Sequence, residues 1–246
     1  MKRIELYVNF DKTPTPSQIA EAREMIIRRG KREPVAYITP EKEFYSRTFI
    51  VNGDVLIPRP ETEAVVEAAV KEMKRMEKDE IFFADIGTGS GNIAITLLLE
   101  DKRTRCVAVD INEKALATAR KNAERFGVEL RMEFIKGDVF ESVPPEMKFD
   151  MIVSNPPYIS EDEVDALPPD VIAYEPRHAL FAEEGGTGVI GKIIDGCKER
   201  LLPGGCLVME LSRTKDMAAR IEKMLEESAL FSAVEHFDPS VITGRR

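Results

Sequence analysis

The chain has little cysteine and histidine and no tryptophan, and these shortages exclude several classes of protein. Its 246 residues include three cysteines and two histidines. Cys106, Cys197 and Cys206 lack Cys-x-x-Cys or other metal-binding spacing, so no metal site is expected. Their odd number is typical of reduced thiols in a cytoplasmic protein. No apolar run approaches the roughly 18 residues of a membrane-spanning helix, and no apolar core follows Met1, Lys2 and Arg3 as in a secretory signal.

The charged residues are unevenly placed along an acidic chain. The formal net charge of −9 argues against stable nucleic-acid binding through the surface as a whole. A basic cluster nevertheless falls within ten positions, opposed only by Glu24: Arg23, Arg28, Arg29, Lys31 and Arg32. This cluster has two interpretations: a solvated helix end, whose cations suit the helix dipole, or a patch that contacts a partner.

Turn and cap signals divide the chain into a short N-terminal region, residues 1–57, and a larger domain, residues 58–246. In the first region Ser17 is expected to cap a helix that ends at Gly30. Strand-like pieces follow at 43–45 and 48–51, with a turn at Asn52 and Gly53. They predict a β-hairpin.

The larger domain alternates between strands and helices. Pro60 opens its first helix, with Glu61 and Glu63 in the first turn, where carboxylates are favoured. Apolar runs predict strands at 81–85, 105–110, 131–136, 149–154, 206–210, 231–236 and 240–243. Helical patterns lie between them at 91–100, 112–126, 188–202 and 214–227. Asn112 is expected to cap the second of these helices and Gly127 to end it, and residues 203–205 are expected to end the third. This alternation predicts an α/β fold with a parallel sheet and helices on both faces.

A glycine-rich loop, Asp85-Ile86-Gly87-Thr88-Gly89-Ser90-Gly91, joins the strand at 81–85 to the next helix. Three glycines at alternate positions let the backbone pass close to a ligand. The spacing matches neither Walker A nor Gly-x-Gly-x-x-Gly, and no lysine follows to hold phosphates. The loop therefore suits a nucleoside ligand without a pyrophosphate.

Two aspartates follow the next two strands. Asp110 comes nineteen residues after Gly91, where a carboxylate suits a ribose diol. Asp138 lies just beyond the third strand and is placed to accept a hydrogen bond from an adenine amino group. Either aspartate alone could be a helix cap or a turn residue. Together with the glycine loop, they indicate a cofactor site.

The sequence Asn155-Pro156-Pro157-Tyr158 ends the strand at 149–154. Because proline fixes φ and has no N–H, the turn is stiff and holds the Pro156 carbonyl in place. Ligands bind at this carboxyl edge of open α/β sheets. An ordinary Asn-Pro turn is the simpler interpretation. The arrangement also suits an amide or amine nitrogen held by two acceptors beneath an aromatic ring.

The strand series, the glycine loop and the aspartates resemble those of the class I S-adenosylmethionine-dependent methyltransferases. The resemblance implies a Rossmann-like fold whose seven-stranded, mostly parallel sheet has its last strand inserted antiparallel. It also implies S-adenosylmethionine as cofactor and S-adenosylhomocysteine as product. The cofactor-binding residues that it indicates are Asp85, Gly87, Thr88, Gly89, Ser90, Gly91, Asp110, Ile111, Asp138, Val139 and Asn155.

Two further blocks narrow the resemblance. Asn-Pro-Pro-Tyr occurs in methyltransferases that act on adenine N6 of DNA or on glutamine N5 of proteins. The segment 55–63, with Pro58-Arg59-Pro60-Glu61-Thr62-Glu63, is similar to the hallmark of the release-factor glutamine methyltransferases, the HemK/PrmC family. Residues 32–38, 43–44 and 174–180 are similar to other segments of that family, so the resemblance covers residues 32 to about 210.

By this resemblance the chain methylates a glutamine side chain of a peptide-chain release factor or a similar translation protein. The expected catalytic residues are Asn155, Pro156 and Tyr158. The substrate-binding set adds Pro157, Arg59 and Glu61, of which the last two could instead cap a helix start. His178 is a tempting base, but a structural histidine beside Arg177 is the simpler interpretation.

Two alternatives stay open from the residues alone. The first is an N6-adenine nucleic-acid methyltransferase, against which the acidic composition and the lack of a target-recognition domain both argue. The second is a catalytically degenerate, cofactor-binding partner subunit. The short N-terminal region favours it, as do departures from the family pattern after Leu180 and Glu210.

Overall fold

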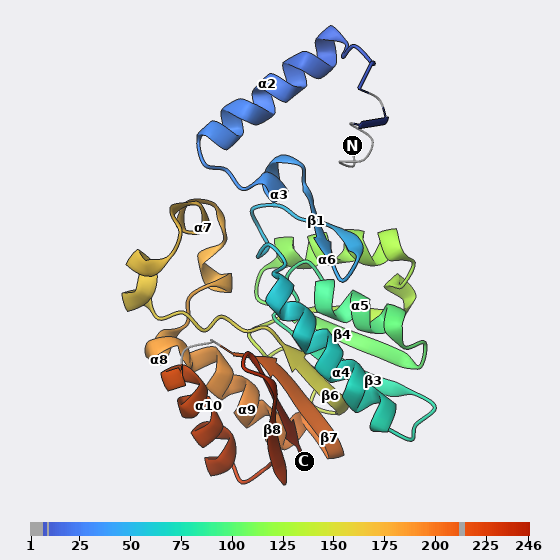
Figure 1. Cartoon of the computed structure of the whole chain (residues 1–246). Helices are drawn as coiled ribbons and strands as arrows, with labels where there is room; N and C mark the ends of the chain where they lie inside the picture. Colours follow the sequence, from blue (N-terminus) through green and yellow to red (C-terminus); the bar gives the residue numbers. More distant parts are fainter. Residues whose placement is uncertain (1–6, 9, 212–214) are drawn as a thin grey trace.

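The centre of the molecule is a seven-stranded sheet with the order β5-β4-β3-β6-β7-β9-β8 (Figure 1). It is seen in a computed structural model that describes residues 7–8, 10–211 and 215–246. The strands are β3 (Ile81–Ile86), β4 (Thr104–Asp110), β5 (Met132–Lys136), β6 (Phe149–Ser154), β7 (Leu201–Glu210), β8 (Ala233–Asp238) and β9 (Val241–Arg245). The first five are parallel, and β9 lies antiparallel between β7 and β8. The predicted seven-stranded, mostly parallel sheet is confirmed.

Helices cover both faces of the sheet because the strand side chains alternate between two apolar clusters. On one face α4 (Glu63–Arg75), α5 (Asn92–Glu100) and α6 (Glu113–Phe126) contribute to the cluster that contains Phe83 and Met151. On the other, α9 (Gly188–Arg200) and α10 (Lys215–Glu227) contribute to the cluster that contains Ala84 and Ile152. All six residues of β6 are buried, as expected for a central parallel strand.

Several further elements are short. They are α3 (Val35–Ile38), η1 (Pro60–Thr62), η2 (Glu129–Arg131), η3 (Glu161–Ala166), α7 (Pro169–Tyr174), η4 (Arg177–Ala179) and α8 (Glu183–Gly186). Four of them, from η3 to α8, form the connection between β6 and α9. The sequence analysis predicts none of these four, because each is too short to show a helical period.

Local signals place several helix ends correctly. Pro60 is the first residue of η1, which continues directly into α4. The Asn112 side chain caps α6 by accepting a hydrogen bond from Lys114 N at 3.0 Å. Gly127 ends α6 with a φ of 66°, in the left-handed region that glycine adopts without strain.

The start of β7 differs from the prediction. The helix expected over 188–202 ends at Arg200, and residues 203–205, expected to end that helix, lie inside β7. The pairing of β6 with β7 changes register between Phe149 and Met151. A Cβ on Gly205 would lie 2.7 Å from the Asp150 carbonyl oxygen. The glycine therefore marks a close backbone approach within a strand and not the end of a helix.

Helix α2 (Pro16–Gly30) extends away from the sheet and has no buried residue (Figure 1). The predicted cap at Ser17 is wrong by two positions. Thr15 caps the helix: its side chain accepts from Gln18 N at 3.3 Å, and the Gln18 side chain accepts from Thr15 N at 2.9 Å. Ser17 cannot cap because Pro16 already occupies the first helical position.

The C-terminal end of α2 is tethered to the rest of the protein. Arg28 forms an ion pair with Glu33 and donates to the Tyr37 carbonyl at 3.2 Å. The Tyr174 hydroxyl donates to the Lys31 carbonyl at 2.7 Å, which ties the α2 end to the last residue of α7. The helix is therefore held at one end and exposed along its length.

The predicted hairpin is present as β1 (Glu41–Phe44) and β2 (Arg47–Ile50), but its turn differs. The strands are joined by Tyr45 and Ser46, with φ values of 49° and 59°. Two positive φ values give the backbone twist that a two-residue hairpin needs. Asn52 and Gly53 form a separate turn after the hairpin, in which Val55 N donates to the Asn52 carbonyl at 3.2 Å.

The hairpin is packed into the larger domain, with Phe44 and Phe49 in the same apolar cluster as α4 and α5. The buried Asn122 of α6 fixes its position. Its side-chain oxygen accepts from Ile50 N at 2.8 Å, and its nitrogen donates to the carbonyls of Ile50 (2.9 Å) and Ser90 (2.8 Å). One amide thus joins the hairpin to the glycine loop. The boundary between residues 57 and 58 stays a prediction.

We expect Asn122→Ala to lower the free energy of unfolding by at least about 2 kcal/mol, because it leaves backbone groups of Ile50 and Ser90 without partners. Urea unfolding at an unchanged m-value would measure the loss. The exposed neighbour Lys121, changed to Ala, is the matched control on the same helix. A loss within about 0.5 kcal/mol of the control would show that the three hydrogen bonds do not hold the hairpin.

Candidate functional site

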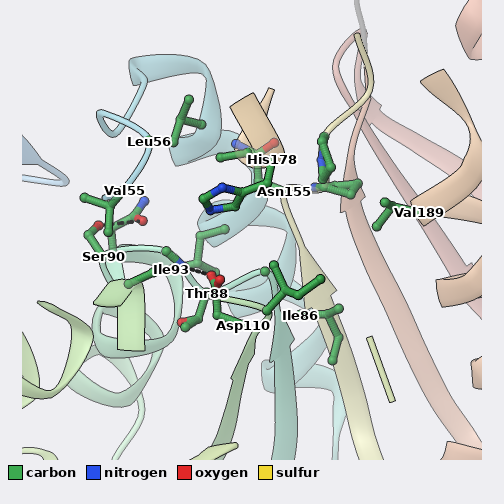
Figure 2. Close-up of a pocket in the computed structure, with 18 of the residues that line it drawn as sticks. Val55, Leu56, Ile86, Thr88, Ser90, Ile93, Asp110, Asn155, His178 and Val189 are labelled. Atoms are coloured by element: carbon green, nitrogen blue, oxygen red, sulfur yellow. Dashed lines mark hydrogen bonds between the residues drawn. The ribbon is translucent and has the colours of Figure 1, made fainter. Parts of the chain in front are cut away.

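The carboxyl ends of the central parallel strands meet at a cavity of about 210 Å³, which we name the first cavity (Figure 2). The sequence analysis predicts four cofactor-binding segments, and all of them reach this cavity: the glycine loop and the segments at Asp110, Asp138 and Asn155. The predicted cofactor residues that line it are Gly87, Thr88, Gly89, Ser90, Asp110, Ile111, Asp138, Val139 and Asn155. The predicted residues Asp85 and Gly91 do not line it.

The glycine loop keeps its shape through backbone conformations that favour glycine. Gly87, Gly89 and Gly91 have φ values of 73°, 54° and 78°. A Cβ on Gly91 would lie 2.9 Å from Cδ1 of Ile95, so this residue also allows the loop to pass close to α5. Gly91 therefore contributes to the shape of the loop without lining the cavity, whereas Gly87 and Gly89 line it.

Asp85 lies beneath the loop, fully buried. Its Oδ2 accepts from the Thr88 hydroxyl at 2.7 Å and from Ala94 N at 3.3 Å, which joins the loop to the start of α5. Burial raises the pKa of this carboxyl to about 7, because the charged form is poorly solvated there. Asp85 does not line the first cavity, and its role in cofactor binding stays a prediction.

Asp110 is buried at the end of β4, against the loop. Its two carboxylate oxygens accept from Gly89 N and Asn112 N, each at 2.9 Å. Burial raises its pKa, and these two N–H groups oppose the rise. Each oxygen keeps a further lone pair, so the carboxylate can also accept from a pair of ligand hydroxyls.

The other predicted nucleoside contacts lie on the walls of the first cavity. The side chain of Ile111 is half exposed, and Val139 follows Asp138 with a φ of 52°. Asp138 forms an ion pair with Lys192 of α9. His178 also lines the first cavity, and its Nε2 lies 3.4 Å from Asn112 Nδ2. The sequence analysis favours a structural role for His178 and misses this position.

A second cavity, of about 400 Å³, adjoins the first. The two share Leu56, Arg59, Asn155, Pro156, Pro157 and Ala179. Tyr158 lines only the second cavity, whose other residues include Leu167, Val171 and Glu210. Asn155 and its two prolines therefore lie on the boundary between the cavities. The predicted substrate residue Glu61 is exposed and lines neither.

Two side-chain contacts that the sequence analysis does not predict hold this boundary. Asn155 Nδ2 donates to the hydroxyl of the buried Thr62 at 3.0 Å. The Glu175 carboxylate accepts from Arg59 at 2.5 Å and from Ile57 N at 3.1 Å. Thr62 and Glu175 both lie in segments that resemble the family, which is the signal that could have identified them.

Within residues 7–8, 10–211 and 215–246, no cluster of three or more histidine, cysteine or acidic side chains is arranged to hold a metal ion. In the same ranges no helix combines the length and apolar character needed to cross a membrane.

Sequence comparisons place this chain among methyltransferases. Residues 68–178 match the methyltransferase small domain family, and residues 1–39 match the PrmC N-terminal domain family. The release factor glutamine methyltransferase of Rhodopirellula baltica is 41% identical over 228 residues, which cover 92% of this chain and 76% of the relative. That of Koribacter versatilis is 38% identical over 246 residues, which cover 99% and 86%.

Comparison with solved structures of low sequence identity shows the same fold and carries no information on function. The catalytic domain of hMettl16, solved with the MAT2A 3′UTR hairpin 6, superposes with a TM-score of 0.62 at 15% identity. The match covers 95% of this chain and 93% of that one. A methyltransferase from Pyrococcus furiosus superposes with a TM-score of 0.56 at 14% identity and covers 92% and 98%.

We expect stability to depend on pH through Asp85. Below about pH 4 the residue is protonated in both states, and between about 4 and 7 only the unfolded chain releases the proton. As the pH rises through this range, the free energy of unfolding therefore falls by up to roughly 1.4 kcal/mol per pH unit. It levels off above about pH 7. Asp85→Asn cannot ionise, so its melting temperature should rise relative to wild type across this window. Parallel curves for the two proteins would contradict the shifted pKa.

We expect Asp110→Ala to weaken binding of S-adenosylmethionine, because the ribose diol loses a charged acceptor worth roughly 1.5–3 kcal/mol. Titration calorimetry should show Kd raised by about one to two orders of magnitude. Glu113→Ala, which removes a nearby exposed carboxylate outside the cavity, should leave Kd unchanged. Equal affinities of wild type and Asp110→Ala would exclude Asp110 as a cofactor ligand.

Proposed function

The chain belongs to the release factor glutamine methyltransferase family and is an S-adenosylmethionine-dependent protein-glutamine N5-methyltransferase; we propose that its acceptor is a peptide-chain release factor. We propose further that the first cavity binds the cofactor and the second binds the acceptor glutamine. The observation that carries this division is the position of Asn155 and Pro156 on the boundary between the two cavities.

The residues of the first cavity fit S-adenosylmethionine. The backbone of Gly87 and Gly89 is open to a ligand on one side, with the Asp110 carboxylate next to it. Ile111 and Val139 supply apolar walls for a planar base. When bound, this cofactor supplies a methyl group on a positively charged sulfur. The chain has only to present a nitrogen to it at the right distance and angle.

Positioning is the task of the boundary residues, because an amide nitrogen is a poor nucleophile. Its lone pair is delocalised into the carbonyl. The Asn155 side-chain oxygen and the Pro156 carbonyl are the two acceptors proposed for the two amide hydrogens, which fixes the nitrogen in place. Both oxygens also stabilise the positive charge that develops on nitrogen. Tyr158, in the wall of the second cavity, covers the amide and excludes water.

A strong base is not required for this reaction, because the nitrogen becomes acidic as the methyl group is transferred. His178 lines the first cavity and not the second. The proposed acceptor amide is bound in the second cavity. His178 is therefore assigned to the wall around the cofactor.

The exposed helix α2 supports a protein acceptor. It buries none of its own residues, and the side chains of Ile26 and Ile27 are mostly exposed. Arg28 and Arg29 are engaged by Glu33 and by backbone carbonyls at the helix end. The rest of the basic cluster is exposed, and we propose that the helix contacts the acceptor protein.

We also propose a cytoplasmic location. Cys106, Cys197 and Cys206 are all buried and unpaired, and burial raises the pKa of each thiol. Buried, unpaired thiols are typical of proteins in a reducing compartment.

We expect Asn155→Ala to lower kcat by at least about 10², because the acceptor amide loses one of two fixed electrostatic contacts. Cofactor affinity and fold should stay near wild type, since the Pro156-Pro157 turn keeps the backbone in place. Single-turnover methylation of a release factor, read by intact mass, gives the rate, and a cofactor titration of the same variant is the control.

Three results would speak against the proposal. Methylation by Asn155→Ala at a rate within a few-fold of wild type would exclude the proposed role of the Asn155 side chain in holding the acceptor amide. Methylation of DNA but not of a release factor by the wild-type protein would favour an N6-adenine methyltransferase. A wild-type protein that binds the cofactor and methylates neither would favour a partner subunit.

A further inference from the structure

The residue that follows Tyr158 is paired with a distant stretch of the chain. Ile159 N donates to the Leu180 carbonyl at 3.1 Å, and Ala182 N donates to the Ile159 carbonyl at 3.0 Å. Both bonds have only one possible direction, because a backbone N–H donates and a carbonyl accepts. Tyr158, which lines the second cavity, is therefore followed at once by a fixed point of the backbone.

The distant stretch continues into residues 184–186, which we name the left-handed turn. Glu184, Gly185 and Gly186 have φ values of 56°, 64° and 89°. A glutamate rarely adopts a positive φ, so this conformation persists only where the surrounding structure holds it. The left-handed turn closes α8 and leads into α9.

The Arg220 side chain of α10 holds the left-handed turn. Its guanidinium donates to the carbonyls of Glu184 and Gly185 at 3.1 and 3.2 Å, and to the Thr187 hydroxyl at 3.4 Å. That hydroxyl donates its own hydrogen to the Glu184 carbonyl at 3.0 Å. A guanidinium cannot accept and a carbonyl cannot donate, so the direction of these contacts is unambiguous.

The left-handed turn contacts the backbone of Tyr158 through Gly186. A Cβ at position 186 would overlap the Tyr158 carbonyl oxygen and would lie 2.9 Å from Cε of Met217 in α10. Glycine is therefore required here both for its positive φ and for the missing Cβ. The Tyr158 backbone thus lies directly against a turn that Arg220 holds.

We propose that Arg220 and Gly186 are positioning residues that set the place of Tyr158 in the wall of the second cavity. The inference rests on the proposed role of Tyr158 in covering the acceptor amide. Neither Arg220 nor any residue of the left-handed turn lines either cavity, so both residues act through Tyr158. A displacement of about 1 Å at a reacting group can cost up to about 10² in rate.

The first test is Arg220→Met, which keeps a long side chain and removes all of its donors. We expect kcat for single-turnover methylation of a release factor to fall about tenfold, with the cofactor Kd within about twofold of wild type. Lys223→Met is the matched control, because this exposed lysine of α10 forms an ion pair with Glu227 of the same helix. The control should match wild type in both measurements.

The second test is Gly186→Ala, which adds the Cβ that the Tyr158 carbonyl excludes. We expect a loss of kcat at least as large as that of Arg220→Met, because the backbone of one of the two segments must move. Gly191→Ala is the matched control, since a Cβ there would lie at an ordinary distance of 3.4 Å from Cε of Met224. It should keep the wild-type kcat.

The third test asks whether Arg220 acts through Tyr158. Arg220→Met is combined with Tyr158→Ala, and in this background the loss of the guanidinium should change kcat by less than about twofold. A tenfold loss from Arg220→Met in both backgrounds would show that the two residues act independently, and it would overturn the inference.

The remaining outcomes separate the inference from the proposed function. If Tyr158→Ala is impaired but Arg220→Met and its control have the same kcat, the inference is wrong and the role of Tyr158 stands. If Arg220→Met loses cofactor affinity as much as kcat, Arg220 supports the fold in general, and the inference is also wrong. If Tyr158→Ala keeps the wild-type kcat, Tyr158 does not cover the acceptor, and the inference is overturned with that role.

Discussion

The buried carboxylate of Glu175 is the contact on which the arrangement of the site depends. Its side chain is 1% exposed and binds both the Arg59 guanidinium and the backbone N–H of Ile57. A buried charge is tolerated only when it is paired, so these groups are fixed relative to one another. Arg59 lines both cavities, so this ion pair holds in place a side chain on the boundary between them.

The cavities can share a boundary because the sheet brings Asn155 to its carboxyl edge from a fully buried strand. The backbone there is rigid, since β6 has strands on both sides and two prolines follow it. Chemistry at this site therefore requires little movement of the main chain.

The sequence predicts well those features that depend on residues close to one another in the chain. Pro60, Asn112 and Gly127 each act within one helical turn, and the glycine loop is recognisable within seven positions. The missed features depend on distant partners. Asn155 meets Thr62 across 93 positions, and the hairpin turn uses Tyr45 and Ser46 in conformations that their types rarely adopt. Asp85 is in the predicted loop, but its burial beneath Thr88 follows only from the packing of α5.

The amide of Asn122 has a consequence for how the protein opens and closes. It binds the hairpin through Ile50 and the glycine loop through the Ser90 carbonyl, so neither segment can move away without breaking bonds that the other shares. A ligand that binds the closed loop should therefore also stabilise the hairpin and increase the protection of its amides from hydrogen exchange. Ligand binding at the glycine loop and the stability of the N-terminal hairpin are in this sense thermodynamically linked.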